Sequence, residues 1–276
     1  MVNRHEGGPR GGEHDPWTGQ DRPGTGNVAA SFPAVVGGEY ALERVLRRGP
    51  QGETVLARAL SSGRPVVVEL LGEGLADEPG RARFVHAAEL GMRLSHPNVL
   101  RTVEAGVDPR PYAVIDHVPG ETLAERLAGG ARLNASETMT LATHLAAGLT
   151  HAHGSGVVHG GLDAHAVVLG DDGVARIGGF GYARIVDTDP PAGDSRGSGP
   201  AGDVHDLGAV LRQAAGEPLA PGLTALVDAA LAHPAVRPSI FDLFHQIVAL
   251  TGPPGVWLPA ATATPQPSAA SGSATT

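Results

Sequence analysis

The pattern of apolar and polar positions between residues 38 and 252 indicates strands first and helices later. Residues 40–46 and 54–59 carry alternating apolar and β-forming residues around a Gly-Pro-Gln-Gly turn, which predicts a β-hairpin. Further apolar runs predict three more strands at 66–71, 99–107 and 112–115. The first part of the chain is therefore expected to form a β-sheet.

The later part has the spacing of amphipathic helices. Leu141, Leu145 and Leu149 recur every four residues, which places them on one face of a helix at 135–153. An aspartate start and a Ser-His-Pro end predict an earlier helix at 77–94. Three more helices are predicted at 203–215, 223–232 and 239–250. Strands with one helix, followed by helices alone, predict an α+β protein with a β-rich first lobe and a helical second lobe.

The two ends of the chain lack this periodicity. Residues 1–37 are rich in Gly, Pro and Asp and are expected to be disordered, and residues 253–276 form a low-complexity tail. The folded domain is therefore expected at 38–252. The N-terminus has no apolar signal segment and no run reaches 18 apolar residues, so we expect a cytoplasmic protein without membrane insertion.

Composition narrows the function. The formal charge of −9 argues against binding to nucleic acid or to an anionic membrane surface. The absence of cysteine excludes disulfides and thiol chemistry. All 20 residues in the Lys+Arg count are arginine, so any chemistry that needs a lysine has none to use.

Eight stretches of the sequence occur in the same order as the motifs of a known family. They are LRRGPQGETVLAR, PVVVELL, LSHPNVL, PYAVIDHVPGETLAERL, GVVHGGLDAHAVVL, ARIGGFGYAR, AGDVHDLGAVL and HPAVRPS. In sequence they resemble the glycine-rich loop, third strand, turn after helix C, hinge with helix D, catalytic loop, D-F-G segment, helix F and final Arg-Pro of protein kinases. The chain most resembles the bacterial Ser/Thr kinases, which implies a bilobal protein kinase-like fold.

The resemblance places a nucleotide cleft between the lobes. Its lining is expected to include Gly49, Gly52, Val67, Ile115, Asp116 and Val118. Of the three glycine positions of the phosphate-binding loop, the first is Arg47, and Pro50 removes one backbone N–H. Val67 stands where the family has alanine beside the adenine ring, so it narrows the purine site. The cleft is therefore expected to be vestigial.

The positions that the resemblance assigns to catalysis hold other residues, namely Glu69, Ala87, Gly160, Gly161, Asp163, Ala166 and Gly179. Glu69 replaces the lysine that holds the ATP phosphates, and a carboxylate there repels them. Gly161 replaces the catalytic base and Gly179 the main magnesium ligand. We therefore expect no catalytic residue, no metal site, and absent or weak binding of ATP and magnesium.

The residues retained from the family motifs are those that pack. His159, Phe180 and Gly181 are kept, Asp203 is expected to cap helix F and hold the catalytic-loop backbone, and Arg237 lacks its usual partner. The candidate phosphorylation sites, chosen by expected exposure alone, are Thr188, Ser195 and Ser198.

These observations favour a catalytically inactive pseudokinase, not an enzyme, with a regulatory or scaffold role in bacterial Ser/Thr kinase signalling, in which cell-wall control is one setting. Its expected partner is an active Ser/Thr kinase or a phosphothreonine-binding protein. One alternative is a weak or atypical ATP-dependent Ser/Thr protein kinase, which magnesium-dependent phosphate transfer would reveal. The other is a nucleotide-binding sensor without catalysis, which a ligand-dependent thermal shift would reveal.

Overall fold

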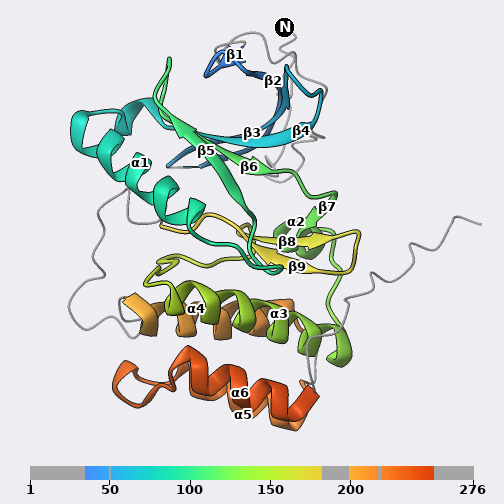
Figure 1. Ribbon diagram of the computed structural model, residues 1–276. Helices are drawn as coiled ribbons and strands as arrows, with labels where there is room; N and C mark the ends of the chain where they lie inside the picture. The colour runs from blue at the N-terminus through green and yellow to red at the C-terminus, as the bar shows by residue number, and fades with distance from the viewer. Residues whose placement is uncertain (1–34, 50, 182–198, 217–218, 252–276) are drawn as a thin grey trace, which may run out of the picture. The chain divides into compact units, whose positions relative to one another are not determined.

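The computed structural model describes residues 35–49, 51–181, 199–216 and 219–251, and all of them lie in one compact unit, residues 33–276 (Figure 1). Among these residues no helix is both long enough and apolar enough to cross a membrane. Pro50, the three candidate phosphorylation sites at 188, 195 and 198, and almost all of both predicted tails lie outside the described residues. The boundaries expected for the tails therefore stay predictions.

A six-stranded antiparallel sheet forms the first lobe, with its strands in the order β1-β2-β3-β4-β6-β5 (Figure 1). The strands are β1 (Val35–Val36), β2 (Tyr40–Gly49), β3 (Gly52–Ala59), β4 (Pro65–Leu71), β5 (Thr102–Gly106) and β6 (Tyr112–Asp116). The predicted hairpin is β2–β3, and the three predicted further strands are β4, β5 and β6. Alternation of apolar residues was thus a sufficient signal for the long strands.

The helix of this lobe is α1 (Glu78–Met92), which follows a short 3-10 turn, η1 (Glu73–Leu75). Asp77 caps α1 by accepting a hydrogen bond from the backbone N–H of Gly80 at 2.9 Å. The buried face of the helix packs on the sheet in a small apolar cluster, whose buried members are Leu71, Phe84, Ala87, Ala88 and Ala113. This packing fixes α1 on the sheet, chiefly beside β5.

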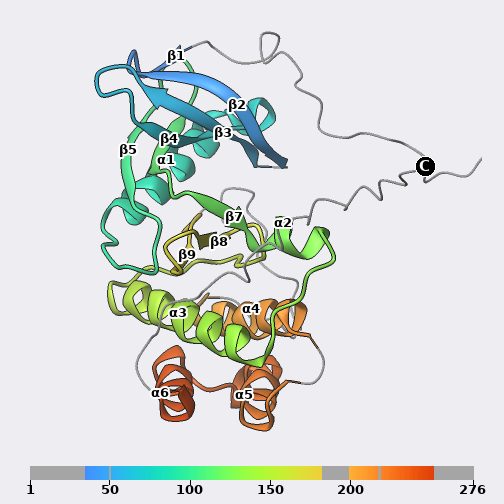
Figure 2. The same ribbon diagram turned by 90° about the vertical axis from the view of Figure 1, so that its right-hand side faces the viewer.

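The second lobe begins with a small sheet in the order β7-β8-β9 and continues with helices (Figure 2). Its elements are β7 (Gly120–Thr122), α2 (Leu123–Ala128), α3 (Ala135–Gly154), β8 (Val167–Gly170), β9 (Ala175–Ile177), α4 (Gly199–Ala214), α5 (Pro221–Leu231), the 3-10 turn η3 (Pro234–Val236) and α6 (Ile240–Thr251). Asn134 and Glu137 form a capping box at the start of α3, and Leu141, Leu145 and Leu149 are fully buried as predicted. One apolar core joins these elements.

The expected kinase-like α+β fold is confirmed, and its local differences from expectation have physical reasons. β7, β8 and β9 were not predicted because strands of three or four residues carry too little periodicity. Val35 and Val36 form a strand inside the segment expected to be disordered, because they pair with Ala41 and Tyr40. Helix α4 begins at Gly199, four residues before the predicted start, so Asp203 lies inside it.

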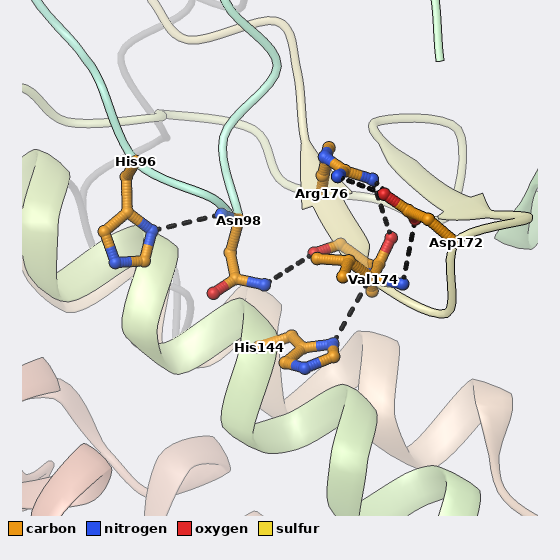
Figure 3. Close-up of polar contacts among 7 residues, drawn as sticks. His96, Asn98, His144, Asp172, Val174 and Arg176 are labelled. Atoms are coloured by element: carbon orange, nitrogen blue, oxygen red, sulfur yellow. Dashed lines mark hydrogen bonds and ion pairs between the residues drawn. The ribbon is translucent and has the colours of Figure 1, made fainter. Parts of the chain in front are cut away.

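Polar contacts fasten the loop before β5 to the second lobe (Figure 3). The side-chain amide of Asn98 donates to the backbone carbonyl of Ala175 at 2.9 Å, and the backbone N–H of Ala175 donates to Nδ1 of His144 at 3.1 Å. Val99 forms a single bridge with Ile177 instead of starting β5, which shortens the predicted strand. The two lobes are thereby joined through the loop before β5.

The adjacent turn is held by its own aspartate. Asp172 accepts from the backbone N–H of Val174 and from the guanidinium of Arg176 (Figure 3). The hydrogen bond from Arg176 is the main reason that the pKa of Asp172 lies below its usual value. This role is typical of an aspartate in an Asp-Asp-Gly turn, where the side chain holds the backbone.

Candidate functional site

A cleft of about 580 Å³ is lined by both lobes. Its volume lies within the range of about 300–1,000 Å³ that is typical of small-molecule sites. Its sheet side carries Leu56, Val67 and Ile115, which lie on one row across β3, β4 and β6. Val168 of β8 lines it from the second lobe. The cleft therefore has apolar surface on both sides.

The structure brings the six predicted cleft residues together. Gly49, Gly52, Val67, Ile115, Asp116 and Val118 all line this cleft. Gly49 and Gly52 are paired at the end of the β2–β3 hairpin. At Gly52 the backbone has φ of +146°, and a Cβ atom there would lie 1.9 Å from the carbonyl oxygen of Leu70. A glycine is thus required at Gly52 for the hairpin to lie against β4.

In the protein kinase family a lysine and a glutamate form an ion pair at the positions held here by Glu69 and Ala87. These two residues cannot form that pair, because alanine has no charge. Glu69 is half-buried on β4 and lines the cleft. Ala87 is buried in the cluster under α1, and a Cβ atom built on Gly181 would lie only 3.2 Å from its Cβ. Ala87 therefore serves as a packing residue between α1 and the segment after Phe180.

His159 is the centre of the catalytic loop. It is buried, its Nε2 lies 2.8 Å from the carbonyl oxygen of Gly178, and its ring meets Phe180 edge-on with 4.9 Å between centroids. The Phe180 ring is buried as well. These contacts join the catalytic loop to the D-F-G-like segment, as the interpretation of both residues as packing members predicts.

Asp203, on α4, holds the backbone of the same loop. Its carboxylate accepts hydrogen bonds from the backbone N–H groups of His159 and Gly160, both at 2.8 Å, and lies 2.7 Å from Nε2 of His153. Burial alone would raise the pKa of Asp203, but the hydrogen bond from His153, the charge of His159 and the two backbone donors outweigh it, so the pKa is lowered. The expected hold on the loop backbone is present, whereas the expected capping role is wrong.

The side chain of Arg237 donates hydrogen bonds to backbone carbonyl groups, since the sequence lacks the glutamate that usually pairs with this arginine in the family. Its guanidinium donates to the carbonyl oxygens of Ala201 and Ala232. These bonds tie the first turn of α4 to the end of α5. The sequence left its partner open, because carbonyl acceptors leave no mark on the residue pattern.

The remaining predicted positions carry little charge into the cleft. Gly161, Ala166 and Gly179 line it without a side chain that can bind a proton or a metal ion. Gly160 and Gly179 adopt φ of +82° and +75°. Asp163 also lines the cleft, and its Oδ1 accepts from the backbone N–H groups of His165 and Ala166 at 2.9 and 3.0 Å.

Magnesium is the ion that this family would imply, and the residues do not fit it. Within the described part of the chain no group of three or more His, Cys, Asp or Glu residues is arranged to hold a metal ion. The one carboxylate of the catalytic loop, Asp163, already uses Oδ1 to hold backbone N–H groups. No step of the chemistry is therefore assigned to a protein-bound metal.

Two functional features were not found from the sequence. His153 pairs with Asp203 across 50 positions, which no local pattern indicates. Arg44 and Arg47 line the cleft from β2, and the resemblance directed attention to the lost glycine at Arg47 instead of to its charge. The acidic Glu69 at the phosphate-binding position was a signal in the sequence, because a cation elsewhere in the cleft would be needed to compensate for it.

Two lobes with this strand order, a cleft between them and a loop held by Asp203 define a protein kinase-like domain. A profile of the protein tyrosine and serine/threonine kinase family matches residues 40–199. The chain belongs to that family.

Similar proteins agree. A probable serine/threonine-protein kinase of Streptomyces coelicolor is 33% identical over 160 residues, covering 56% of this chain and 24% of that protein. The probable serine/threonine-protein kinase PkwA of Thermomonospora curvata is 32% identical over 197 residues, covering 64% of this chain and 26% of that protein. The chain thus spans about a quarter of the length of these two relatives.

A solved structure has the same fold. The kinase domain of Mycobacterium tuberculosis PknI, in a mutant form, superposes with a TM-score of 0.65 at 23% identity. The match covers 81% of this chain and 100% of that domain. The likeness extends over both lobes of the kinase-like fold.

These comparisons correct one expectation. The chain was expected not to be an enzyme, because the positions of the catalytic groups hold glycine, alanine and glutamate. The relatives are named as serine/threonine-protein kinases, which points to an enzyme and contradicts that expectation. The expectation rested on side chains at single positions, whereas the family and the named relatives are kinases.

Proposed function

We propose that this chain is an atypical ATP-dependent Ser/Thr protein kinase with a slow transfer step. The observation that carries the proposal is the cleft of about 580 Å³, lined by the glycine-containing hairpin and the catalytic loop, in a member of the kinase family. A cleft with apolar surface on both sides suits a purine ring, and the hairpin beside it suits a phosphate chain.

The purine is assigned to the apolar end of the cleft. Leu56, Val67 and Ile115 offer it one face and Val168 the other. Asp116, His117 and Val118 line this end of the cleft, which places the backbone of this segment beside the ring edge. Val67 takes more room than an alanine would, which lowers affinity without closing the cleft.

Asp163 is the group that we assign to the substrate hydroxyl. It is the carboxylate that the catalytic loop brings to the cleft, and the loop fixes it through Oδ1. In the transfer step the serine or threonine oxygen forms a bond to the γ-phosphorus, and the bond from that phosphorus to the bridging oxygen breaks. ADP leaves, and the hydroxyl proton passes to the Asp163 carboxylate.

The rate is expected to be low. Gly161, Ala166 and Gly179 supply no charge to the transferring phosphate, and Glu69 opposes it. Loss of a single preorganised electrostatic group costs on the order of 10²–10³ in rate. The proposal therefore concerns turnover far below that of a kinase with all of these groups.

The test is transfer of labelled γ-phosphate from ATP to a Ser/Thr peptide mixture, with phosphosites located by mass spectrometry. Asp163→Asn should abolish transfer and leave ATP binding within about twofold. Asp171→Asn is the matched control, since Asp171 is an exposed carboxylate in the β8–β9 turn that does not line the cleft. Equal transfer by the wild type and Asp163→Asn would mean a contaminating kinase, and the proposal would fall.

The expected protein partner, an active Ser/Thr kinase or a phosphothreonine-binding protein, stays a prediction, as does the regulatory setting. Affinity purification from the native cell tests both. Recovery of neither class of partner at stoichiometric levels would count against them.

A further inference from the structure

Two arginines line the cleft from β2, and the proposed transfer step does not use them. Arg44 and Arg47 are exposed, and their side chains form no ion pair or hydrogen bond with another described residue. No other arginine is among the described residues that line the cleft, and the chain contains no lysine. Any phosphate chain in this cleft therefore depends on them for a permanent positive charge.

A bulge in β2 turns both arginines to the cleft. Residues three apart in a regular strand point to opposite faces of a sheet. The register of β2 against β3 shifts between Val45 and Arg47, so that Leu46 is an extra residue. Arg44 then stands opposite Leu56, and Arg47 stands opposite Thr54. Leu56 and Thr54 both line the cleft, so the extra residue re-aims the two arginines onto one face.

Arg47 lies on the same row of the sheet as Glu69. Arg47 pairs with Thr54 of β3, and Thr54 pairs with Glu69 of β4. Two strand spacings separate the row's ends, which is about 10 Å. The position that normally carries the phosphate-binding lysine is thus acidic, and a cation stands two strands away on the same row of the sheet.

The guanidinium of Arg47 lies beside the glycine turn. Its Nη1 is 3.5 Å from the place that a Cβ atom on Gly49 would occupy. A phosphate that approaches the bare backbone of Gly49 would therefore meet this guanidinium as well. Planar guanidinium groups bind phosphate through two parallel hydrogen bonds, which a backbone N–H can supplement.

Nearby acidic residues already have cations of their own. Glu53 accepts from Arg48 at 3.0 Å and from Arg110 at 3.3 Å. Glu121 forms an ion pair with Arg126 at 2.5 Å. These carboxylates have their own arginine partners, so they do not need Arg44 or Arg47, whose charges face the cleft.

We propose that Arg47, assisted by Arg44, binds the phosphate chain of the nucleotide, so that the phosphate-binding cation has moved from β4 to β2. The inference rests on the proposed function, because it presumes that the cleft takes ATP. It adds that affinity for the phosphates is set by the strand before the glycine turn.

Calorimetric titration of the full chain with ATP and with adenosine, in EDTA, tests the inference. Wild-type protein should bind ATP at least tenfold more tightly than adenosine. Arg47→Ala should lower the affinity for ATP about tenfold, which corresponds to about 1.4 kcal/mol. It should leave the affinity for adenosine within about twofold of the wild-type value. Arg44→Ala should have a smaller effect in the same direction. Arg64→Ala, an exposed arginine between β3 and β4 that does not line the cleft, is the charge-matched control and should change neither.

The outcomes separate the two proposals. If the wild type binds ATP and transfers phosphate while Arg47→Ala binds ATP equally well, the assignment of Arg47 is wrong and the proposed function stands. An equal loss of ATP and adenosine in Arg47→Ala overturns the assignment, because it marks a general disturbance of the cleft. If the wild type binds neither ligand, the proposed function fails and this inference fails with it.

Discussion

The buried residues that support the cleft are those of the family motifs, whereas residues on its rim differ from those motifs. His159, Phe180 and Asp203 (the packing frame) are buried, although His159 also borders the cleft. The two polar members use their side chains in contacts with the protein itself. On the rim, Glu69, Gly161 and Gly179 stand where the family has the phosphate-binding lysine, the catalytic base and the main magnesium ligand. The contrast indicates that burial restricts the packing frame, whereas the rim changes without unfolding the lobe.

The largest predicted effect is on the packing frame. Asp203→Ala should lower the free energy of unfolding by about 3–5 kcal/mol, because it leaves His153 and two backbone N–H groups buried without their acceptor. Urea unfolding followed by circular dichroism measures the change. A loss below about 1 kcal/mol would mean that the lobe does not depend on Asp203, and the contrast with the rim would disappear.

The pH dependence of stability, compared between the wild type and Asp203→Asn, sharpens the prediction. Because the pKa of Asp203 in the folded state lies below its usual value of about 3.9, its contribution to stability is complete above about pH 4. That contribution is lost as the pH falls through the lowered pKa. Stability of the wild type should therefore fall more steeply at acid pH than that of Asp203→Asn, which keeps the shape of the side chain. Parallel acid limbs would contradict this assignment.

Phe180 gives the next effect. Phe180→Ala should destabilise the protein by about 3 kcal/mol, since it empties a buried site and removes the edge-on contact with His159. Phe241→Ala is the matched control, because that ring is 44% exposed on α6 and should cost less than about 1 kcal/mol. Equal changes in melting temperature for the two variants would show that the ring of Phe180 is not part of the core.

Most of the architecture followed from the sequence because its signals are local. The Leu141, Leu145, Leu149 repeat identified α3, and the Asp77 start identified α1, each within a few residues. The packing frame was recognised because His159 and Phe180 stand in motifs with a fixed order. The start of α4 was missed because Asp203 looks like a helix cap, whereas the fold directs its carboxylate to a loop about 40 residues earlier.

The site was less predictable because its key features depend on register and on distant partners. The bulge at Leu46 decides which way Arg44 and Arg47 point, and a one-residue shift in pairing is invisible in composition or periodicity. The lost charges were visible at once, so the sequence favoured inactivity. Arg44 and Arg47, which β2 brings to the cleft, weaken the argument from loss.

The smallest predicted effect is on the rim. Glu69→Lys should change the free energy of unfolding by less than about 1 kcal/mol, because the residue is half-buried on the cleft face of β4 and is not a member of the packing frame. It should tighten ATP binding about tenfold by replacing a repulsive charge with an attractive one. Glu69→Gln, which only removes the charge, should have an intermediate effect.

The same substitution also bears on where the phosphate chain lies. Since Arg47 and Glu69 share one row of the sheet, Glu69→Lys should restore ATP affinity to Arg47→Ala, as it returns the cation to β4. It should not raise phosphate transfer by more than about tenfold, because Ala166 and Gly179 still supply no charge to the transferring phosphate. Unfolding of Glu69→Lys would show that rim and frame are coupled, and unchanged ATP affinity would place the phosphates away from β4.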